Sequence, residues 1–229
     1  MACKFPNIIN VVYGYFYTAW KESSAKILQD EGSKKVYNSI YHDMKRLLFS
    51  VTIFLIAVMP FAFNVFINKQ YGEAYLYIPL IIIATYYANL SSFIGGIFTA
   101  FKKTKIIGTT TVFAAIINLV VDLILIWKMQ IYAACISTLL ANLIIYYYRK
   151  YKLRELVKLR ELNMFGPGII LGLVCFTYYI RYFKNVSMTV SYVINAVVLI
   201  LVIAYSVAVN KKIFVKILGK FIPKFRERI

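Results

Sequence analysis

The residues of this sequence that could do chemistry in an apolar setting are few, and Asp122 comes first among them. It is the only acidic residue within any long apolar segment, and Asn118 precedes it by one helical turn. A carboxylate is costly in lipid, so Asp122 should face a bundle interior or water, either protonated or paired. One interpretation is a site for proton or cation coupling. The other is a residue at headgroup level that meets Lys128 or another hydrogen-bond partner.

Small and polar residues recur every four positions in three consecutive apolar segments. The seams comprise Ala84, Ala88, Ser92, Gly96 and Ala100 in one segment, Thr110, Ala114, Asn118 and Asp122 in the next, and Ala134, Thr138 and Asn142 in the third. Such spacing lets neighbouring backbones approach closely, so helix packing is the plainer interpretation of the small residues. For the polar residues Asp122, Asn118, Thr138 and Asn142, the alternative is a substrate path or coupling site.

The sequence carries no motif for covalent or metal chemistry. It contains no GxSxG, Walker A or HExxH pattern. Cys3, Cys135 and Cys175 are isolated, and His42 is the single histidine, which argues against a zinc-type site. We therefore expect no enzyme active site, no metal and no bound cofactor.

The elements that must position these residues are long apolar helices. Of the 229 residues, 61% are hydrophobic, whereas a typical soluble domain has about 45–50%. The apolar runs are continuous rather than alternating, which favours helices over strands. We expect an all-α transmembrane bundle of about seven spans, the first and sixth of them marginal in length. The expected spans are 7–20, 47–68, 75–101, 106–127, 131–148, 168–183 and 188–209.

Basic residues divide unequally between the two sets of loops that these spans would create. The formal net charge is +18, from 27 Lys and Arg against 9 Asp and Glu. If the spans alternate in direction, 22 of the 27 basic residues fall on one side, among them Lys102, Lys103 and Lys105. The positive-inside rule places that side in the cytoplasm, with the N-terminus outside and the C-terminus inside. The charge is then a signal of membrane orientation, and we expect no nucleic-acid partner.

Three charged segments of that side also contain regularly spaced apolar residues. Residues 21–46 fit an interfacial helical hairpin, and residues 150–163 fit a charged amphipathic helix. Residues 211–229 form a basic tail suited to the anionic inner leaflet. The lipid bilayer is therefore the first expected partner.

Four stretches resemble motifs of polysaccharide transporters, and they follow one another in order within residues 1–150. They are ACKFPNII at 2–9 with TAW at 18–20, YGEAY at 71–75 with IPL at 78–80, FTAFKKTK at 98–105, and NLVVDLILI at 118–126 with IYAACIST at 131–138. Together they resemble the oligosaccharide flippase (Wzx-like) branch of the multidrug/oligosaccharidyl-lipid/polysaccharide superfamily, whose members share a MATE-like fold.

The resemblance implies a flippase that moves undecaprenyl-pyrophosphate-linked oligosaccharide repeats across the bacterial inner membrane by alternating access. The product would serve O-antigen, capsular or exopolysaccharide synthesis. This chain would correspond to the eighth to last spans of a fourteen-span protein, and the orientation derived from its charges agrees. A single lobe cannot enclose a cavity between two lobes, so the expected partners are the lipid-linked oligosaccharide and a missing N-terminal half. Lys102, Lys103 and Lys105 would attract the pyrophosphate headgroup.

The sequence also departs from the family pattern and leaves other functions open. Gln130 and Ala133 stand where glycines are usual, and Asp122 stands where Asn is common, so a role for Asp122 does not follow from the resemblance. A drug/cation antiporter of the same superfamily is one alternative. The other is a non-catalytic scaffold subunit that assists a polysaccharide polymerase.

Overall fold

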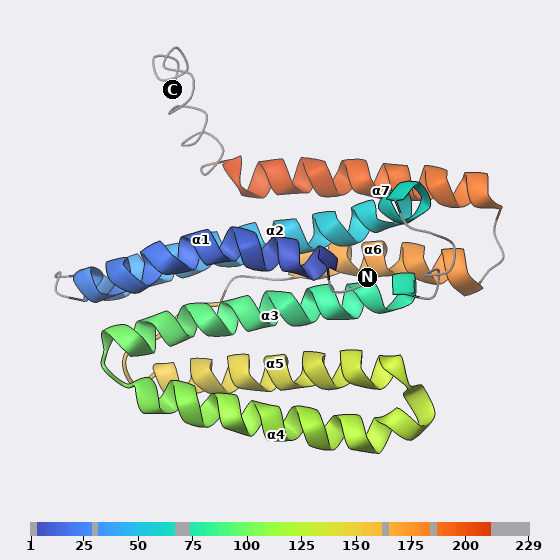
Figure 1. The fold of residues 1–229 in the computed structure, drawn as a ribbon. Helices are drawn as coiled ribbons and strands as arrows, with labels where there is room; N and C mark the ends of the chain where they lie inside the picture. Colours follow the sequence, from blue (N-terminus) through green and yellow to red (C-terminus); the bar gives the residue numbers. More distant parts are fainter. Residues whose placement is uncertain (1–3, 29–31, 67–73, 162–164, 184–186, 212–229) are drawn as a thin grey trace, which may run out of the picture.

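A computed structural model describes residues 4–28, 32–66, 74–161, 165–183 and 187–211. Within these residues the chain forms seven α-helices and no strand, which confirms the predicted all-helical bundle. The helices lie alongside one another and successive helices run in opposite directions, so their ends form two opposite rims (Figure 1). We call the rim that holds the α1–α2 and α3–α4 connections the basic end.

The first two helices are longer than the spans expected for them. α1 runs from Lys4 to Ile27 and α2 from Ser33 to Phe66, so residues 21–27 and 33–46 of the segment predicted as a separate interfacial hairpin, 21–46, instead complete the two helices. The hydroxyl of Tyr37 in α2 donates to the carbonyl of Ser24 in α1 at 2.6 Å, and both residues are buried. One face of this part of the chain therefore packs against the rest of the protein, and the other face is exposed.

α3 (Ala74–Ala100) lies between α1 and α2 on one side and the hairpin of α4 (Thr104–Met129) and α5 (Ile131–Leu153) on the other (Figure 1). Trp20 of α1 fixes one side of this arrangement. Its ring stacks on Phe93 of α3 with 4.3 Å between the centroids, and its Nε1 donates to the Phe93 carbonyl at 3.1 Å.

The last two helices, α6 (Phe165–Phe183) and α7 (Met188–Val209), pack against α2. The Tyr178 hydroxyl of α6 donates to the Ile56 carbonyl at 2.8 Å. Asn210, which caps the C-terminal end of α7, donates from Nδ2 to the Ser50 hydroxyl at 2.7 Å. Of the predicted basic tail, only Lys211 falls within the described residues.

Residues 154–161, which we call the strap, replace most of the amphipathic helix expected over 150–163. α5 ends at Leu153, and the strap continues without a helix along the first turns of α2. The Asn38 side chain pairs with the strap backbone twice, donating to the Lys158 carbonyl at 3.1 Å and accepting from the Arg160 amide at 2.7 Å. Val157 is buried at 1% exposure, so the apolar positions anchor the strap to the bundle.

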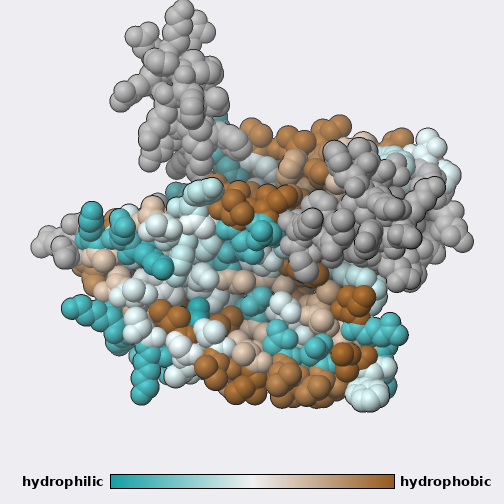
Figure 2. Space-filling model, viewed as in Figure 1, coloured by the Kyte–Doolittle hydropathy of each residue, from teal (hydrophilic) through white to brown (hydrophobic). Residues whose placement is uncertain are grey.

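The outermost helices expose most of their apolar side chains. Among the described residues, α2, α3, α4, α5 and α7 contain stretches long and apolar enough to cross a membrane. In the same residues the two marginal segments, now α1 and α6, do not meet that measure, and the apolar stretch found in α6 is Gly166–Tyr178. Figure 2 shows apolar side chains along the lower edge of the protein, where Figure 1 places α4, and around α7 at the top. Surfaces of this kind suit contact with lipid and indicate that the protein is embedded in a membrane.

Candidate functional site

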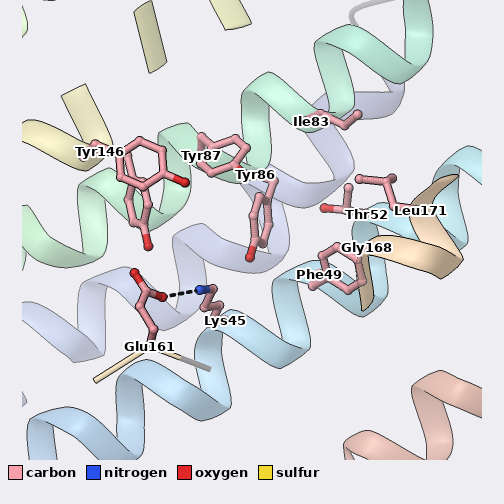
Figure 3. Close-up of a pocket in the computed structure, with 11 residues that line it drawn as sticks. Lys45, Phe49, Thr52, Ile83, Tyr86, Tyr87, Tyr146, Glu161, Gly168 and Leu171 are labelled. Carbon is pink, nitrogen blue, oxygen red and sulfur yellow. Dashed lines mark hydrogen bonds and ion pairs between the residues drawn. The ribbon is translucent and has the colours of Figure 1, made fainter. Parts of the chain in front are cut away.

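A cavity of about 360 Å³ lies among α2, α3, α5 and α6 and reaches the end of the strap. Side chains from all four helices surround it (Figure 3). The lining residues are Lys45, Phe49 and Thr52 of α2, Ile83, Tyr86 and Tyr87 of α3, Tyr146 and Tyr147 of α5, Glu161 of the strap, and Gly168 and Leu171 of α6. Concave sites with mostly apolar walls and a few polar groups are the usual form of ligand pockets.

Helical periodicity explains why these side chains meet. On α2 the three lining residues are spaced by four and then three positions, so they share one face. α3 and α5 each contribute two adjacent tyrosines. Ring contacts join them into a continuous aromatic wall: Tyr86 and Tyr87 lie 5.1 Å apart between centroids, Tyr87 and Tyr146 5.5 Å, and Phe49 and Tyr86 6.0 Å.

One end of the cavity is charged. Lys45 Nζ lies 2.9 Å from Glu161 Oε2, and Lys150 of α5 pairs with the other oxygen of the same carboxylate. The Lys150 ammonium also lies 5.5 Å from the Tyr41 ring centroid and 6.0 Å from that of Tyr146, within the range of cation–π attraction. The hydroxyls of these two tyrosines share a 2.6 Å hydrogen bond.

The cavity becomes apolar away from this cluster. Figure 3 shows Lys45 and Glu161 at one end and Ile83 and Leu171 at the other, with Tyr86 between them. The Tyr86 hydroxyl is buried and has no hydrogen-bond partner among the described residues. A buried hydroxyl without a partner carries a desolvation cost, which a ligand that accepts its hydrogen bond would remove.

The polar residues selected from the sequence lie elsewhere. Asn118 of α4 meets α5: its Oδ1 accepts from the Ser137 hydroxyl at 3.1 Å, and its Nδ2 lies 3.4 Å from Thr138 Oγ1. Asn142 of α5 donates to the Ala84 carbonyl of α3 at 3.1 Å. The fold thus uses these side chains in contacts between helices, and none of them lines the cavity.

Asp122 is half-buried on α4, and its Oδ1 is buried without a hydrogen-bond partner among the described residues. No hydrogen bond joins it to Asn118 in that part of the chain. Lys102, Lys103 and Lys105 are exposed around the α3–α4 turn at the basic end, with Lys102 at a φ of 57°. They lie on the surface and do not contribute to the cavity wall.

The small-residue stripe of α3 packs against two neighbouring helices, α5 and α1. Ala84 faces Asn142 of α5, whereas a Cβ added at Gly96 would lie 2.6 Å from Nε1 of Trp20 on α1. A repeat of four residues drifts by about 40° per step around a 3.6-residue helix, which carries the stripe from one partner to the other. Ala88, Ser92 and Ala100 are half-buried along it.

Arg149 is a buried cation that the sequence patterns did not single out. It is 4% exposed on α5. Its Nε donates to Thr110 Oγ1 at 2.8 Å, its Nη1 donates to the carbonyl and hydroxyl oxygens of Ser91 at 3.2 and 3.1 Å, and its Nη2 donates to the Ile107 carbonyl and Thr111 Oγ1 at 3.0 and 2.9 Å. These bonds use all five N–H donors and join α3, α4 and α5.

The sequence patterns also did not single out most of the residues that line the cavity, although the sequence contains a signal for them. The adjacent tyrosines at 86–87 and 146–148 sit within apolar segments, where tyrosine needs a hydrogen-bond partner for its hydroxyl.

Comparison of the chain with protein-family models, curated proteins and solved structures finds no match in any of the three.

Proposed function

We propose that this chain is part of a transporter that moves a lipid-linked oligosaccharide, attached through a diphosphate, across the bacterial inner membrane. The observation that carries the proposal is the tyrosine-walled cavity with lysine at one end, inside a bundle of membrane-spanning helices. Tyrosine rings offer flat apolar faces to a sugar, their hydroxyls offer hydrogen bonds, and lysine is a point-charge binder of phosphate. The basic end then faces the cytoplasm, where the lipid-linked sugar is made.

The polar residues exposed on α1 support a second lobe that faces this helix across a water-filled space. Asn7, Asn10, Gly14 and Thr18 are all exposed along this helix, beside exposed apolar side chains such as Val11. Exposed amides are poorly suited to lipid, because no water is there to bind them. Asn10 is fixed in place by Asn89 of α3, whose Nδ2 donates to it at 3.1 Å. Alternating access would occur by rocking of two lobes about a site near the midplane.

Deletion of the gene tests the proposal in the cell that encodes the chain. We expect surface polysaccharide to disappear and the lipid-linked repeat to accumulate on the cytoplasmic face, with both effects reversed by the wild-type gene. Restoration by Tyr147→Ala should be weaker than restoration by Tyr148→Ala, because Tyr147 lines the cavity and Tyr148 does not. Unchanged surface polysaccharide after deletion would overturn the proposal.

A drug/cation antiporter is the second candidate, and the unpartnered Oδ1 of Asp122 is the observation that favours it. A buried carboxylate oxygen of this kind can take up a proton or a cation. Asp122→Asn would then abolish proton-coupled efflux of toxic cations while leaving surface polysaccharide intact. If the gene-deletion strain instead loses surface polysaccharide and keeps normal cation efflux, the result favours the flippase.

A further inference from the structure

Two buried lysines share a single carboxylate at the charged end of the cavity. The side chains of Lys45 and Lys150 are 7% and 6% exposed, whereas that of Glu161 is 54% exposed. Among the described residues neither lysine pairs with any other acid. The cluster therefore holds two positive charges against one negative charge, with both positive charges inside and the negative charge at the surface.

The three members of this cluster differ in how firmly they are held. Lys45 and Lys150 belong to long helices, α2 and α5, and their ammonium groups lie over the Tyr41 ring at 5.8 and 5.5 Å. Glu161 belongs to the strap, which has no regular structure there, and its side chain is 54% exposed. The contacts of Asn38 hold the strap at Lys158 and Arg160, so Glu161 can withdraw while the rest of the strap stays attached.

We infer that Lys45, in the cavity wall, and Lys150, which shares the Glu161 carboxylate with it, form an anion-binding site at the charged end of the cavity, and that Glu161 is its tethered occupant, displaced when a phosphate or diphosphate group binds. A diphosphate offers several oxygens and at least two negative charges, so it balances two ammonium groups better than one carboxylate does. The unpartnered hydroxyl of Tyr86 on the adjoining wall is a further donor for such a ligand.

This inference deepens the proposed function and depends on it only for the lipid portion of the ligand. The carboxylate neutralises part of the buried charge when the cavity is empty, which lowers the cost of keeping two lysines out of water. It also competes with the ligand. A tethered group acts at a high effective concentration, so its removal should tighten binding of the competing anion.

Binding by the purified full chain tests the competition. Isothermal titration calorimetry in detergent would use inorganic pyrophosphate, and a second series in nanodiscs would use a short-chain polyprenyl diphosphate. We expect Glu161→Gln to bind at least one of these about tenfold more tightly than wild type. Glu155→Gln removes an exposed acid from the same strap and should bind like wild type.

The lysines are tested in the Glu161→Gln background. Adding Lys45→Gln should abolish the tighter binding, whereas adding Lys152→Gln, on the same helix as Lys150 but with no ion pair to Glu161, should not. Lys45→Arg keeps the charge and should retain measurable binding, which separates loss of the site from loss of the fold. Thermal melts without ligand establish that each variant is folded.

The outcomes distinguish the source of the anion. Binding of pyrophosphate as tightly as the lipid supports a site for the free anion, and binding of the polyprenyl diphosphate alone supports a lipid headgroup. The inference is overturned if Glu161→Gln binds neither probe more tightly than Glu155→Gln, or if its gain survives Lys45→Gln. Transport is not measured here, so that result would leave the flippase proposal standing, and failure of the gene-deletion test would leave the anion site standing.

Discussion

Gly96 is the position where the close approach of α1 and α3 admits no side chain. A Cβ there would lie 2.6 Å from Trp20 Nε1 and 2.7 Å from Trp20 Cδ1. The indole cannot move aside easily, because it is 2% exposed, stacked on Phe93 and hydrogen-bonded to the Phe93 carbonyl. The neighbouring Gly95 is different: its added Cβ would be 3.6 Å from Arg149 Nη1, an ordinary contact.

The two glycines should therefore respond oppositely to alanine. Glycine within a helix costs about 1 kcal/mol relative to alanine, so Gly95→Ala should stabilise the protein by up to about that amount. Gly96→Ala gains the same term but adds about 1–3 kcal/mol of overpacking and about 1 kcal/mol for the disturbed Trp20 hydrogen bond. The net expectation is a loss of about 1–3 kcal/mol at Gly96.

Unfolding by SDS in dodecyl maltoside micelles measures this difference. The chain has two tryptophans, and Trp127 is 89% exposed, so a Trp127→Phe background leaves Trp20 fluorescence as a local probe. Gly96→Ala should shift the transition to lower SDS and change the Trp20 emission, whereas Gly95→Ala should do neither. If Gly96→Ala proves as stable as Gly95→Ala, the packing argument for this contact is wrong.

Three further substitutions test other parts of the fold by the same unfolding measurement. Arg149→Lys keeps the charge but has at most three N–H donors in place of five, so it should destabilise the protein by about 3 kcal/mol. A variant as stable as wild type would show that the guanidinium hydrogen bonds do not hold α3, α4 and α5 together. Gln130 has a φ of 45°, which glycine adopts without strain, so Gln130→Gly should stabilise by about 1 kcal/mol and Gln130→Ala should not. Asn210→Ala removes the 2.7 Å bond to Ser50 and should cost about 1 kcal/mol with faster hydrogen exchange in α7; unaltered exchange would contradict that role.

The sequence by itself was sufficient for the class of fold and the approximate place of each helix. Long apolar runs have few solutions other than helices in a bilayer, because every backbone group must be hydrogen-bonded within the segment. The sequence by itself did not decide the backbone at Gln130: glycine was expected there only from the resemblance, and the structure has a positive φ at this glutamine. It did not predict that residues 21–27 and 33–46 would complete α1 and α2, because an amphipathic stripe looks the same whether it packs on lipid or on another helix.

The site was decided by the tertiary structure. The four-residue spacing placed Asn118 and Asp122 on one face of one helix and Asn142 on a face of the next. Only the packing showed that Asn118 and Asn142 form hydrogen bonds with neighbouring helices. Lys45 and Glu161 are 116 positions apart, and Lys45 was indistinguishable in sequence from the exposed loop lysines. Burial of a charge depends on which distant segment covers it and which opposite charge arrives with it. Neither is encoded in local spacing, so the cavity and the lysine pair that shares Glu161 form only when the strap and four helices are placed together.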